Sequence, residues 1–203
     1  MNKPVEPFSH PTATQPMASA AGQSLPHESA HLHVSGQATY TDDIPELTGT
    51  LHAALGLSPL AHGKLLGIDL ATLKAQPGVV AVLTAADVPG LNDCGALVHD
   101  DPILADGLLH YLGQPVFAVL ATDRESARRA ASLAKSVIQA EPLPALLTPE
   151  ADHQAGQYVV PPMHLSRGDA QHALNTAPHR LPLRVDLGGQ EQFYLEGQIS
   201  YAI

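Results

Sequence analysis

Five consecutive residues, His27-Glu-Ser-Ala-His31, match the H-E-x-x-H pattern of zinc proteases. That chemistry needs two imidazoles one helical turn apart, which hold the metal, and a glutamate that acts as general base. Pro26 precedes the pattern and Gly36 follows it closely, so the sequence predicts no stable helix at these positions. We therefore expect an exposed entrance to a strand here and assign no metal ligand.

The segment Gly188-Gly189-Gln190-Glu191 contains a second group of residues suited to chemistry. Two adjacent glycines allow a sharp backbone bend and the close approach of a ligand. The amide of a glutamine can donate a hydrogen bond to an oxo group. The same residue types are typical of a plain turn, and these four positions alone favour the turn.

Cys94 is the only cysteine of the chain. The chain by itself therefore cannot build an internal disulfide, an iron–sulfur cluster or a cysteine-rich zinc site. Asn92 and Asp93 lie beside Cys94 and supply no cation that would lower its pKa. We therefore expect a structural cysteine rather than a reactive thiol.

Arg167-Gly168-Asp169 spells an adhesion tripeptide. Because the chain is poor in cysteine and has no secretory signal, we expect these residues to cap a short helix over 167–173 instead. The sequence also lacks GxGxxG, GxxxxGK[ST] and GxSxG patterns. A glycine-rich nucleotide loop and a nucleophile elbow therefore have no support.

The composition limits the classes of protein that fit. The 203 residues are 44% hydrophobic and 15% charged, which suits a packed globular core. Twenty acidic and ten basic residues give a formal charge of −10, which opposes binding to nucleic-acid phosphates. No apolar run approaches the ~18 residues that a membrane-spanning helix needs, and the N-terminus lacks the features of a secretory signal. We expect a soluble, cytoplasmic protein.

Hydrophobic patterns predict alternating strands and helices in the central region. Short apolar or β-branched runs bounded by glycine or proline are typical of strands. A helix over 70–76 ends at Pro77-Gly78, and Thr84 caps a single turn over 85–88. The predicted strands of this region cover 34–40, 50–57, 65–69, 79–83 and 116–120.

The longest predicted helix begins at Thr122, which forms a capping box with Glu125. One face of this helix carries small and apolar residues at helical spacing, so it can lie close to a sheet. That face consists of Ala127, Ala130, Ala131, Ala134 and Ile138.

The two ends of the chain differ from the central region. Residues 1–24 mix Pro, Ser, Thr, Ala and Gln without an apolar period, which predicts a disordered tail. Residues 145–165 are rich in Pro, His and Gln and are typical of a linker. Residues 179–187 and 193–203 have strand-like patterns. Because the chain stops inside such a run, we expect it to be a fragment.

Several of these segments together resemble the N-terminal part of the molybdenum-binding large subunit of bacterial xanthine dehydrogenases. The resemblance covers about residues 25–203, and it depends on the combination rather than on any one segment. The segments are His31-Leu-His-Val-Ser-Gly36 with Tyr40-Thr-Asp-Asp-Ile-Pro45, Gly49-Thr-Leu-His-Ala53, Pro77-Gly-Val-Val-Ala-Val-Leu-Thr84, Gly113-Gln-Pro115 with Ala127-Arg-Arg-Ala-Ala131, and Gly188-Gly-Gln-Glu-Gln-Phe-Tyr-Leu-Glu196.

The resemblance implies a mixed fold, of the α+β or α/β class, and a division of the chain. After the tail of residues 1–24, residues 25–146 would form an α/β hammerhead domain. Residues 147–180 would form a linker, and residues 181–203 the truncated beginning of a molybdopterin-binding domain.

The resemblance also implies an activity. In such enzymes, molybdenum bound to molybdopterin hydroxylates xanthine or hypoxanthine with oxygen from water, and electrons pass through 2Fe-2S clusters and FAD to NAD. In the two-subunit bacterial forms, a partner small subunit carries the iron–sulfur clusters and FAD, which agrees with the single cysteine. Gln190 matches the family residue whose amide hydrogen-bonds an oxygen ligand of molybdenum. Gln192 stands where a histidine is common, which leaves a contact at that position open.

The family's catalytic glutamate, its substrate-binding arginine and carboxylate, and most of its pterin contacts are implied to lie beyond Ile203. No catalytic base and no metal ligand are therefore assigned in this chain. We expect the isolated 203-residue chain to hold no cofactor and to be inactive, and to be catalytic only within a longer polypeptide or assembly. A non-enzymatic hammerhead module for assembly or interaction is the alternative.

Overall fold

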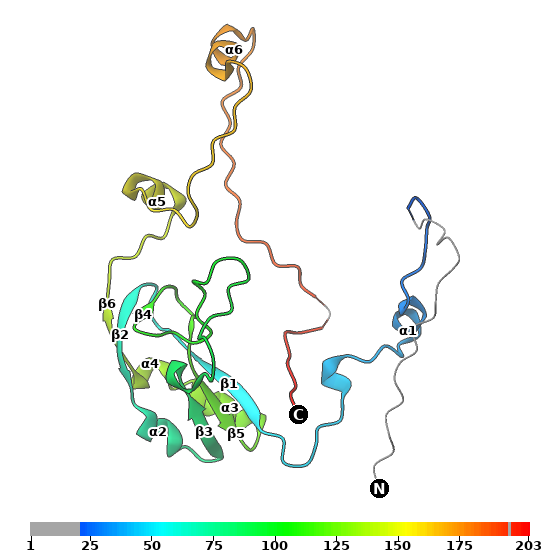
Figure 1. Ribbon diagram of the computed structural model, residues 1–203, viewed down its shortest axis with the longest axis vertical. Helices are drawn as coiled ribbons and strands as arrows, with labels where there is room; N and C mark the ends of the chain where they lie inside the picture. Colours follow the sequence, from blue (N-terminus) through cyan, green and yellow to red (C-terminus); the bar gives the residue numbers. More distant parts are fainter. Residues whose placement is uncertain (1–20, 195) are drawn as a thin grey trace. The chain divides into compact units, whose positions relative to one another are not determined.

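The computed structural model describes residues 21–194 and 196–203 (Figure 1). The chain divides into two compact units. Glu46–Gly189 forms the larger unit, and the described part of Met1–Pro45 forms the smaller one together with Gln190–Ile203. The predicted tail of residues 1–24 lies outside the described residues as far as residue 20.

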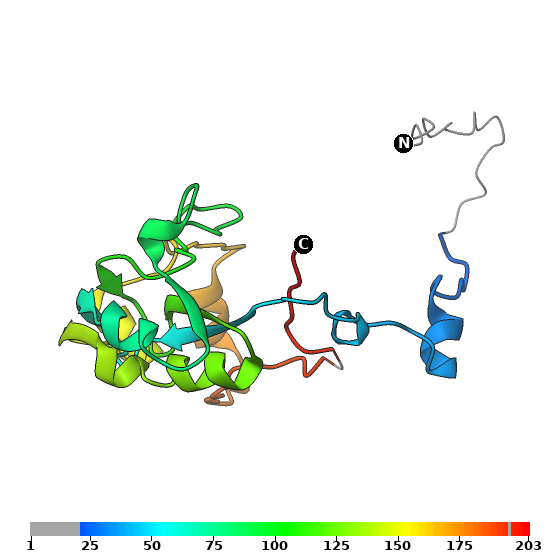
Figure 2. The same cartoon turned by 90° about the horizontal axis from the view of Figure 1, so that it is seen from below.

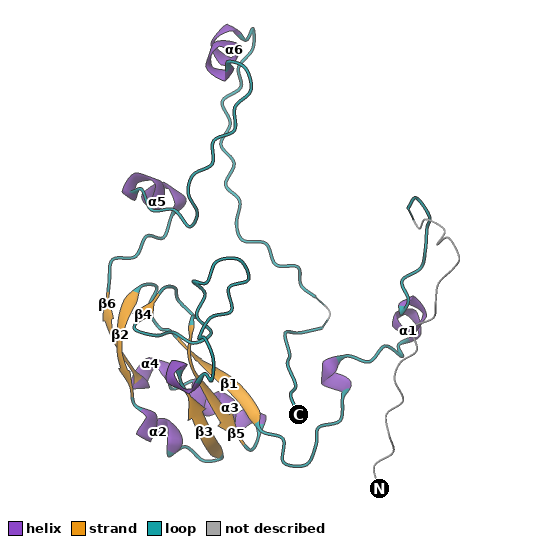
Figure 3. Cartoon of the chain, in the orientation of Figure 1, coloured by secondary structure: helices purple, strands orange, loops and turns teal. Residues whose placement is uncertain are grey.

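Two three-stranded antiparallel sheets make up the frame of the larger unit (Figure 3). In the first sheet, β5 (Pro115–Ala121) lies between β1 (His52–Leu57) and β3 (Val79–Leu83). In the second sheet, β2 (Gly63–Ile68) lies between β4 (Leu108–Leu109) and β6 (Ile138–Pro142). Short helices complete the unit, so the predicted mixed fold class is confirmed.

The helices of the larger unit are α2 (Leu70–Lys74), the 3-10 helix η2 (Ala85–Asp87), α3 (Arg124–Ala131), α4 (Ala134–Val137), α5 (Pro149–Ala155) and α6 (Ala170–Thr176). The smaller unit contains α1 (Ala30–Ser35) and the 3-10 helix η1 (Thr41–Asp43).

Local signals in the sequence predicted most of the larger unit. The strands expected over 50–57, 65–69, 79–83 and 116–120 are confirmed as β1, β2, β3 and β5. The helix over 70–76 is α2, and the single turn after Thr84 is η2. The Thr84 N–H and hydroxyl donate to the Asp87 carboxylate at 2.8 and 2.9 Å, which fixes the start of that turn.

The helix predicted from Thr122 to Ile138 is corrected in two respects. Asp123, not Thr122, is the N-cap of α3: its carboxylate accepts the Ser126 N–H at 2.8 Å and the Ser126 hydroxyl at 2.7 Å. The hydroxyl first, and then the N–H, hold the pKa of Asp123 below its ordinary value. The helix also stops at Ala131, a second helix covers Ala134–Val137, and Ile138 opens strand β6 by pairing with Ile68.

Three predicted strands are wrong. Residues 30–43 contain α1 and η1 where a strand over 34–40 was expected. Residues 179–187 and the described residues of 193–203 form no strand. Their strand-like patterns carry apolar side chains that remain exposed, such as Val34 and Leu187 at 88% and 87%. A strand needs a partner for its backbone groups, and the pattern alone does not supply one.

The core includes buried residues of the first sheet, of the helices and of the second sheet, to which Leu109 and Ile138 belong. Helix α3 packs against β1 and β5, and Figure 2 shows it in light green along the lower side of the larger unit. Ala127 and Ala130 are buried on this face of α3, as the small-residue spacing predicted. Their short side chains let the helix lie close to the strands.

Gly56 and Phe117 make the closest approach within the first sheet. They are paired across β1 and β5, and Phe117 is fully buried. A Cβ placed on Gly56 would overlap the Phe117 ring. Position 56 therefore requires glycine because of this contact.

Candidate functional site

Gln190 is the residue of this chain that the family resemblance connects with catalysis. It opens the segment Gln190–Ile203 of the smaller unit, and its side chain is exposed. Gly188 and Gly189 precede it in irregular backbone, and a Cβ on either glycine would meet no heavy atom within 4 Å. Among the described residues, therefore, no neighbour makes the absence of a side chain necessary at these two positions. Gln190 thus places an exposed amide group at this position.

The backbone turns sharply just after Gln190. The Glu191 carboxylate accepts the Phe193 N–H at 3.4 Å, and Phe193 has a left-handed backbone with φ of 55°. A left-handed conformation costs a bulky residue roughly 1 to 2 kcal/mol. This cost must be offset by the contacts that hold the segment on either side of the turn.

One such contact joins two regions far apart in the sequence. The Thr41 N–H donates to Glu196 Oε1 at 2.7 Å, and both residues are partly buried. Thr41 is the first residue of η1, whose start is closed by a 3.0 Å hydrogen bond from the Tyr40 N–H to Asp43 Oδ2. The carboxylate of Glu196 therefore fixes the residues after Gln190 to the start of η1.

An open hollow of about 440 Å³ lies beside this contact. Tyr40 and Thr41 line it from one segment, and Tyr194, Glu196 and residues 197–199 line it from the other. The Tyr40 hydroxyl lies 3.3 Å from His33 Nδ1, so Tyr40, which lines the hollow, also contacts α1. The hollow thus combines phenol groups with a carboxylate that is already engaged by a backbone N–H.

The two histidines of the H-E-x-x-H pattern do not lie on the same helix. His27 lies outside α1, and its Nδ1 accepts the Ser29 N–H at 3.1 Å, whereas His31 is on α1 and exposed. The expected strand entrance is wrong, because this segment is a short helix that ends at left-handed Gly36. Among residues 21–194 and 196–203, no three His, Cys, Asp or Glu side chains are placed to hold a metal ion.

Cys94 is exposed and donates a hydrogen bond from Sγ to the Asp101 carbonyl at 3.3 Å. Partial loss of solvent around the sulfur raises the pKa of Cys94, and the negative charge of Asp101 adds to this effect. A raised pKa keeps the thiol protonated and slow to react. This agrees with the expectation of an unreactive cysteine.

The Arg167-Gly168-Asp169 tripeptide caps a helix, as predicted. Asp169 is the N-cap of α6, and its Oδ1 accepts the His172 N–H at 2.8 Å. The helix covers Ala170–Thr176, three residues later than the predicted span.

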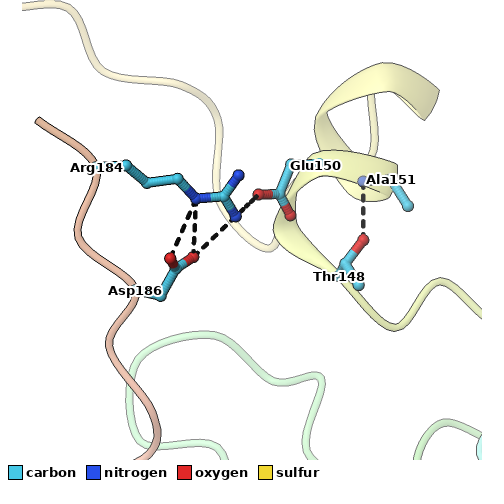
Figure 4. Close-up of polar contacts among 5 residues, drawn as sticks. All are labelled: Thr148, Glu150, Ala151, Arg184 and Asp186. Atoms are coloured by element: carbon cyan, nitrogen blue, oxygen red, sulfur yellow. Dashed lines mark hydrogen bonds and ion pairs between the residues drawn. The ribbon is translucent and has the colours of Figure 1, made fainter. Parts of the chain in front are cut away.

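A cluster that the sequence analysis missed lies in the region 147–189 (Figure 4). Arg184 binds Asp186 through Nε and Nη2, at 2.9 to 3.2 Å, and also reaches Glu150 Oε1 at 3.2 Å. Glu150 stands in the first turn of α5, where the Thr148 hydroxyl accepts the Ala151 N–H. All three charged side chains are exposed, so solvent screens the attraction between them.

Within the part of the chain that the structure describes, no helix is long and apolar enough to cross a membrane.

Comparison with known proteins defines the class. Residues 35–142 match the family model for the a/b hammerhead domain of aldehyde oxidase and xanthine dehydrogenase. This match covers more than half of the chain, so the chain belongs to the aldehyde oxidase and xanthine dehydrogenase family. The two small antiparallel sheets of the larger unit are the hammerhead fold that the sequence predicted.

Individual relatives are oxidoreductases with different substrates in their names. The chain is 40% identical over 182 residues to a xanthine dehydrogenase of Oryza sativa subsp. japonica, with 88% of this chain and 13% of that protein covered. It is 35% identical over 187 residues to a nicotinate hydroxylase of Emericella nidulans, with 90% of this chain and 14% of that protein covered.

The fold is also similar to the crystal structure of the aldehyde oxidoreductase from Desulfovibrio desulfuricans ATCC 27774. The TM-score is 0.57 at 30% identity, over 68% of this chain and 16% of that one. The chain therefore spans only 13% to 14% of the length of the two curated relatives. These similarities establish the family of oxidoreductases, but they do not identify a particular substrate.

Proposed function

We propose that this chain is the N-terminal part of the molybdenum-binding subunit of a xanthine dehydrogenase. In that role the complete enzyme hydroxylates xanthine or hypoxanthine with oxygen from water and passes electrons to NAD. The observation that carries the proposal is the 40% identity to a xanthine dehydrogenase, which extends over 88% of the chain. The proposal includes a cytoplasmic enzyme whose iron–sulfur clusters and FAD lie on a partner small subunit.

The proposed division of the chain follows the resemblance. Residues 25–146 serve as the hammerhead domain, residues 147–180 as a linker, and residues 181–203 as the beginning of a molybdopterin-binding domain. The family match over residues 35–142 supports the first of these. The segment that begins at Gln190 would then leave the larger unit to join the cofactor domain.

Among the described residues, the exposed Gln190 amide fits molybdenum–molybdopterin, and it follows two glycines at which an added Cβ would meet no heavy atom within 4 Å. When bound, this cofactor supplies the two-electron oxidation of a substrate C–H bond. The Gln190 amide N–H would donate a hydrogen bond to an oxygen ligand of the metal and so orient it. An amide accepts no proton at neutral pH, so Gln190 positions a ligand and does not act as the base.

The test uses the longest polypeptide that carries this sequence, expressed with its partner subunits. We expect molybdenum in stoichiometric amount and NAD reduction that depends on xanthine or hypoxanthine. Reduction driven only by aldehydes or by nicotinate would reject the purine specificity. A complex without molybdenum and without activity would favour the non-enzymatic assembly module. The 203-residue chain alone should hold no stoichiometric molybdenum and show no turnover.

Gln190→Ala tests the residue itself in the complete enzyme. One hydrogen bond that positions charge in a dry site is worth roughly 1.5 to 3 kcal/mol, so turnover should fall by about one to two orders of magnitude. Gln157→Ala is a matched control, because Gln157 is an exposed glutamine of the larger unit. Full activity of Gln190→Ala would show that the residue has no role at the metal.

A further inference from the structure

The hydrogen bond between Thr41 and Glu196 joins two distant segments of the smaller unit. It joins residues 155 positions apart in the sequence. Both partners are partly buried, whereas residues 42–49, 190–194 and 197–200 beside them are exposed. Thr41 and Glu196 are therefore less exposed than these neighbouring residues.

The chemistry of this contact makes it stronger than an ordinary turn hydrogen bond. The N–H at the first position of a helix has no partner within the helix, so it needs an acceptor from elsewhere. A carboxylate is the strongest acceptor that a side chain offers, and the 2.7 Å distance is typical of a charge-assisted bond. Glu196 thus supplies what the start of η1 lacks.

We propose that Glu196 is a positioning residue that holds the Gln190 segment in place by binding the start of η1. Glu196 follows Gln190 by six residues, and the turn at Phe193 with its left-handed backbone lies between them. Fixing Glu196 to Thr41 fixes one side of that turn, and this limits where the Gln190 amide can lie. The catalytic consequence rests on the proposed function of Gln190, whereas the contact itself does not.

Thr41→Pro removes the donor without changing the segment that carries Gln190. Proline is well tolerated at the first position of a helix, because the N–H that it lacks would have no acceptor within the helix. Proline also requires an extended residue before it, and Tyr40 is extended, with φ of −97° and ψ of 167°. Thr41→Ser keeps the N–H and serves as the matched control. Glu196→Ala removes the acceptor, and Glu196→Gln keeps an oxygen that can accept.

Chymotrypsin cleavage of the 203-residue chain reports on the segment directly. Cleavage after Phe193 and Tyr194 should become about tenfold faster in Thr41→Pro and in Glu196→Ala, because cleavage follows the population of the open segment. A tenfold change corresponds to ~1.4 kcal/mol. Cleavage after Tyr158, which lies in the larger unit, should not change.

The double variant and the conservative variants decide whether the two residues act together. Thr41→Pro combined with Glu196→Ala should be cleaved no faster than either single variant, since each removes the same bond. Thr41→Ser should behave as the unchanged chain, and Glu196→Gln should restore part of the protection, because a neutral amide oxygen accepts more weakly than a carboxylate. Unchanged cleavage in both single variants, or additive effects in the double variant, would overturn the proposal.

The complete enzyme tests the effect on Gln190. Thr41→Pro should lower kcat and leave KM for the purine unchanged, and adding it to Gln190→Ala should cause no further loss. A further loss in that combination would overturn the positioning role. If the complete enzyme holds no molybdenum, the proposed function fails, and the cleavage experiment still judges the contact between Thr41 and Glu196.

Discussion

Gly56→Ala is expected to destabilise the larger unit because β1 and β5 approach closely at this point. The added methyl group would overlap the Phe117 ring, which is fully buried and paired with Gly56 across the strands. Overpacking of a well-packed core costs about 1 to 3 kcal/mol. For a chain of this size, each kcal/mol lowers the melting temperature by roughly 2 to 4 °C. We therefore expect a fall of about 2 to 12 °C.

Gly67→Ala provides a matched control. Gly67 also lies within a strand, β2, but a Cβ there would meet only Gln139 Oε1, at an ordinary contact distance of 3.5 Å. Replacing a strand glycine by alanine reduces the entropy that the chain loses on folding, by roughly 0.5 to 1 kcal/mol. Gly67→Ala should therefore leave the melting temperature unchanged or raise it slightly.

Thermal unfolding followed by circular dichroism measures both variants, and Phe117→Leu tests the cause. Leucine leaves room above position 56, so Gly56→Ala should cost clearly less in the Phe117→Leu background than in the original chain. Equal melting temperatures for Gly56→Ala and Gly67→Ala would refute the overlap with Phe117. An unchanged cost in the Phe117→Leu background would refute it as well.

Three further predictions concern single polar groups. The pKa of Asp123 is lower in the folded state than its ordinary value of 3.8. The Asp123 carboxylate therefore contributes its full stabilisation above pH 3.8, and this stabilisation is lost as the pH falls through the folded-state pKa. In melting curves recorded between neutral and acidic pH, Asp123→Asn should lose less stability on acidification than the original chain. Asn92→Ala should destabilise the larger unit by about 1 to 3 kcal/mol in urea unfolding, since the Asn92 side chain bonds both the N–H and the carbonyl of Leu104 at 3.0 and 2.7 Å; an unchanged midpoint would contradict this. Cys94 should react with iodoacetamide more slowly than a free cysteine at neutral pH. Asp101→Asn should speed the reaction, because removing this negative charge lowers the thiol pKa. Equal reaction rates for the original chain and for Asp101→Asn would exclude the effect of Asp101.

The sequence predicted one part of the candidate site and not the other. The Gly188-Gly189-Gln190 segment could be identified because a motif is a property of consecutive residues. Glu196 ends the same run, Gly188 to Glu196, but its binding to the Thr41 N–H involves a residue 155 positions away. A capping partner at that separation leaves no local pattern. The Arg184 cluster was missed for a similar reason, since Glu150 lies 34 residues from Arg184.

Where the determining interactions are local, the sequence alone determined the elements. The β-branched run of β3, the stop at Pro77-Gly78 and the hydroxyl–carboxylate pair at η2 all act within a few residues. The N-cap of α3 was off by one residue, because Thr122 and Asp123 both carry suitable oxygens and the choice depends on backbone angles. Asp123 has the extended backbone that a cap requires, with φ of −150° and ψ of 159°.

Only the tertiary structure decided how these elements pair. Ile138 continues the helical spacing of the alanines before it, yet it opens β6 because its backbone pairs with Ile68 of β2. Residues 34–40 and 179–187 alternate as strands do, yet no strand forms, because hydrogen bonding between strands requires an edge at the right place in space. Gly56 lies inside an apolar run that fits a strand with any small residue, and only the Phe117 ring packed against it makes glycine necessary. Such pairings depend on residues distant in the sequence, so a pattern read along the chain does not contain them.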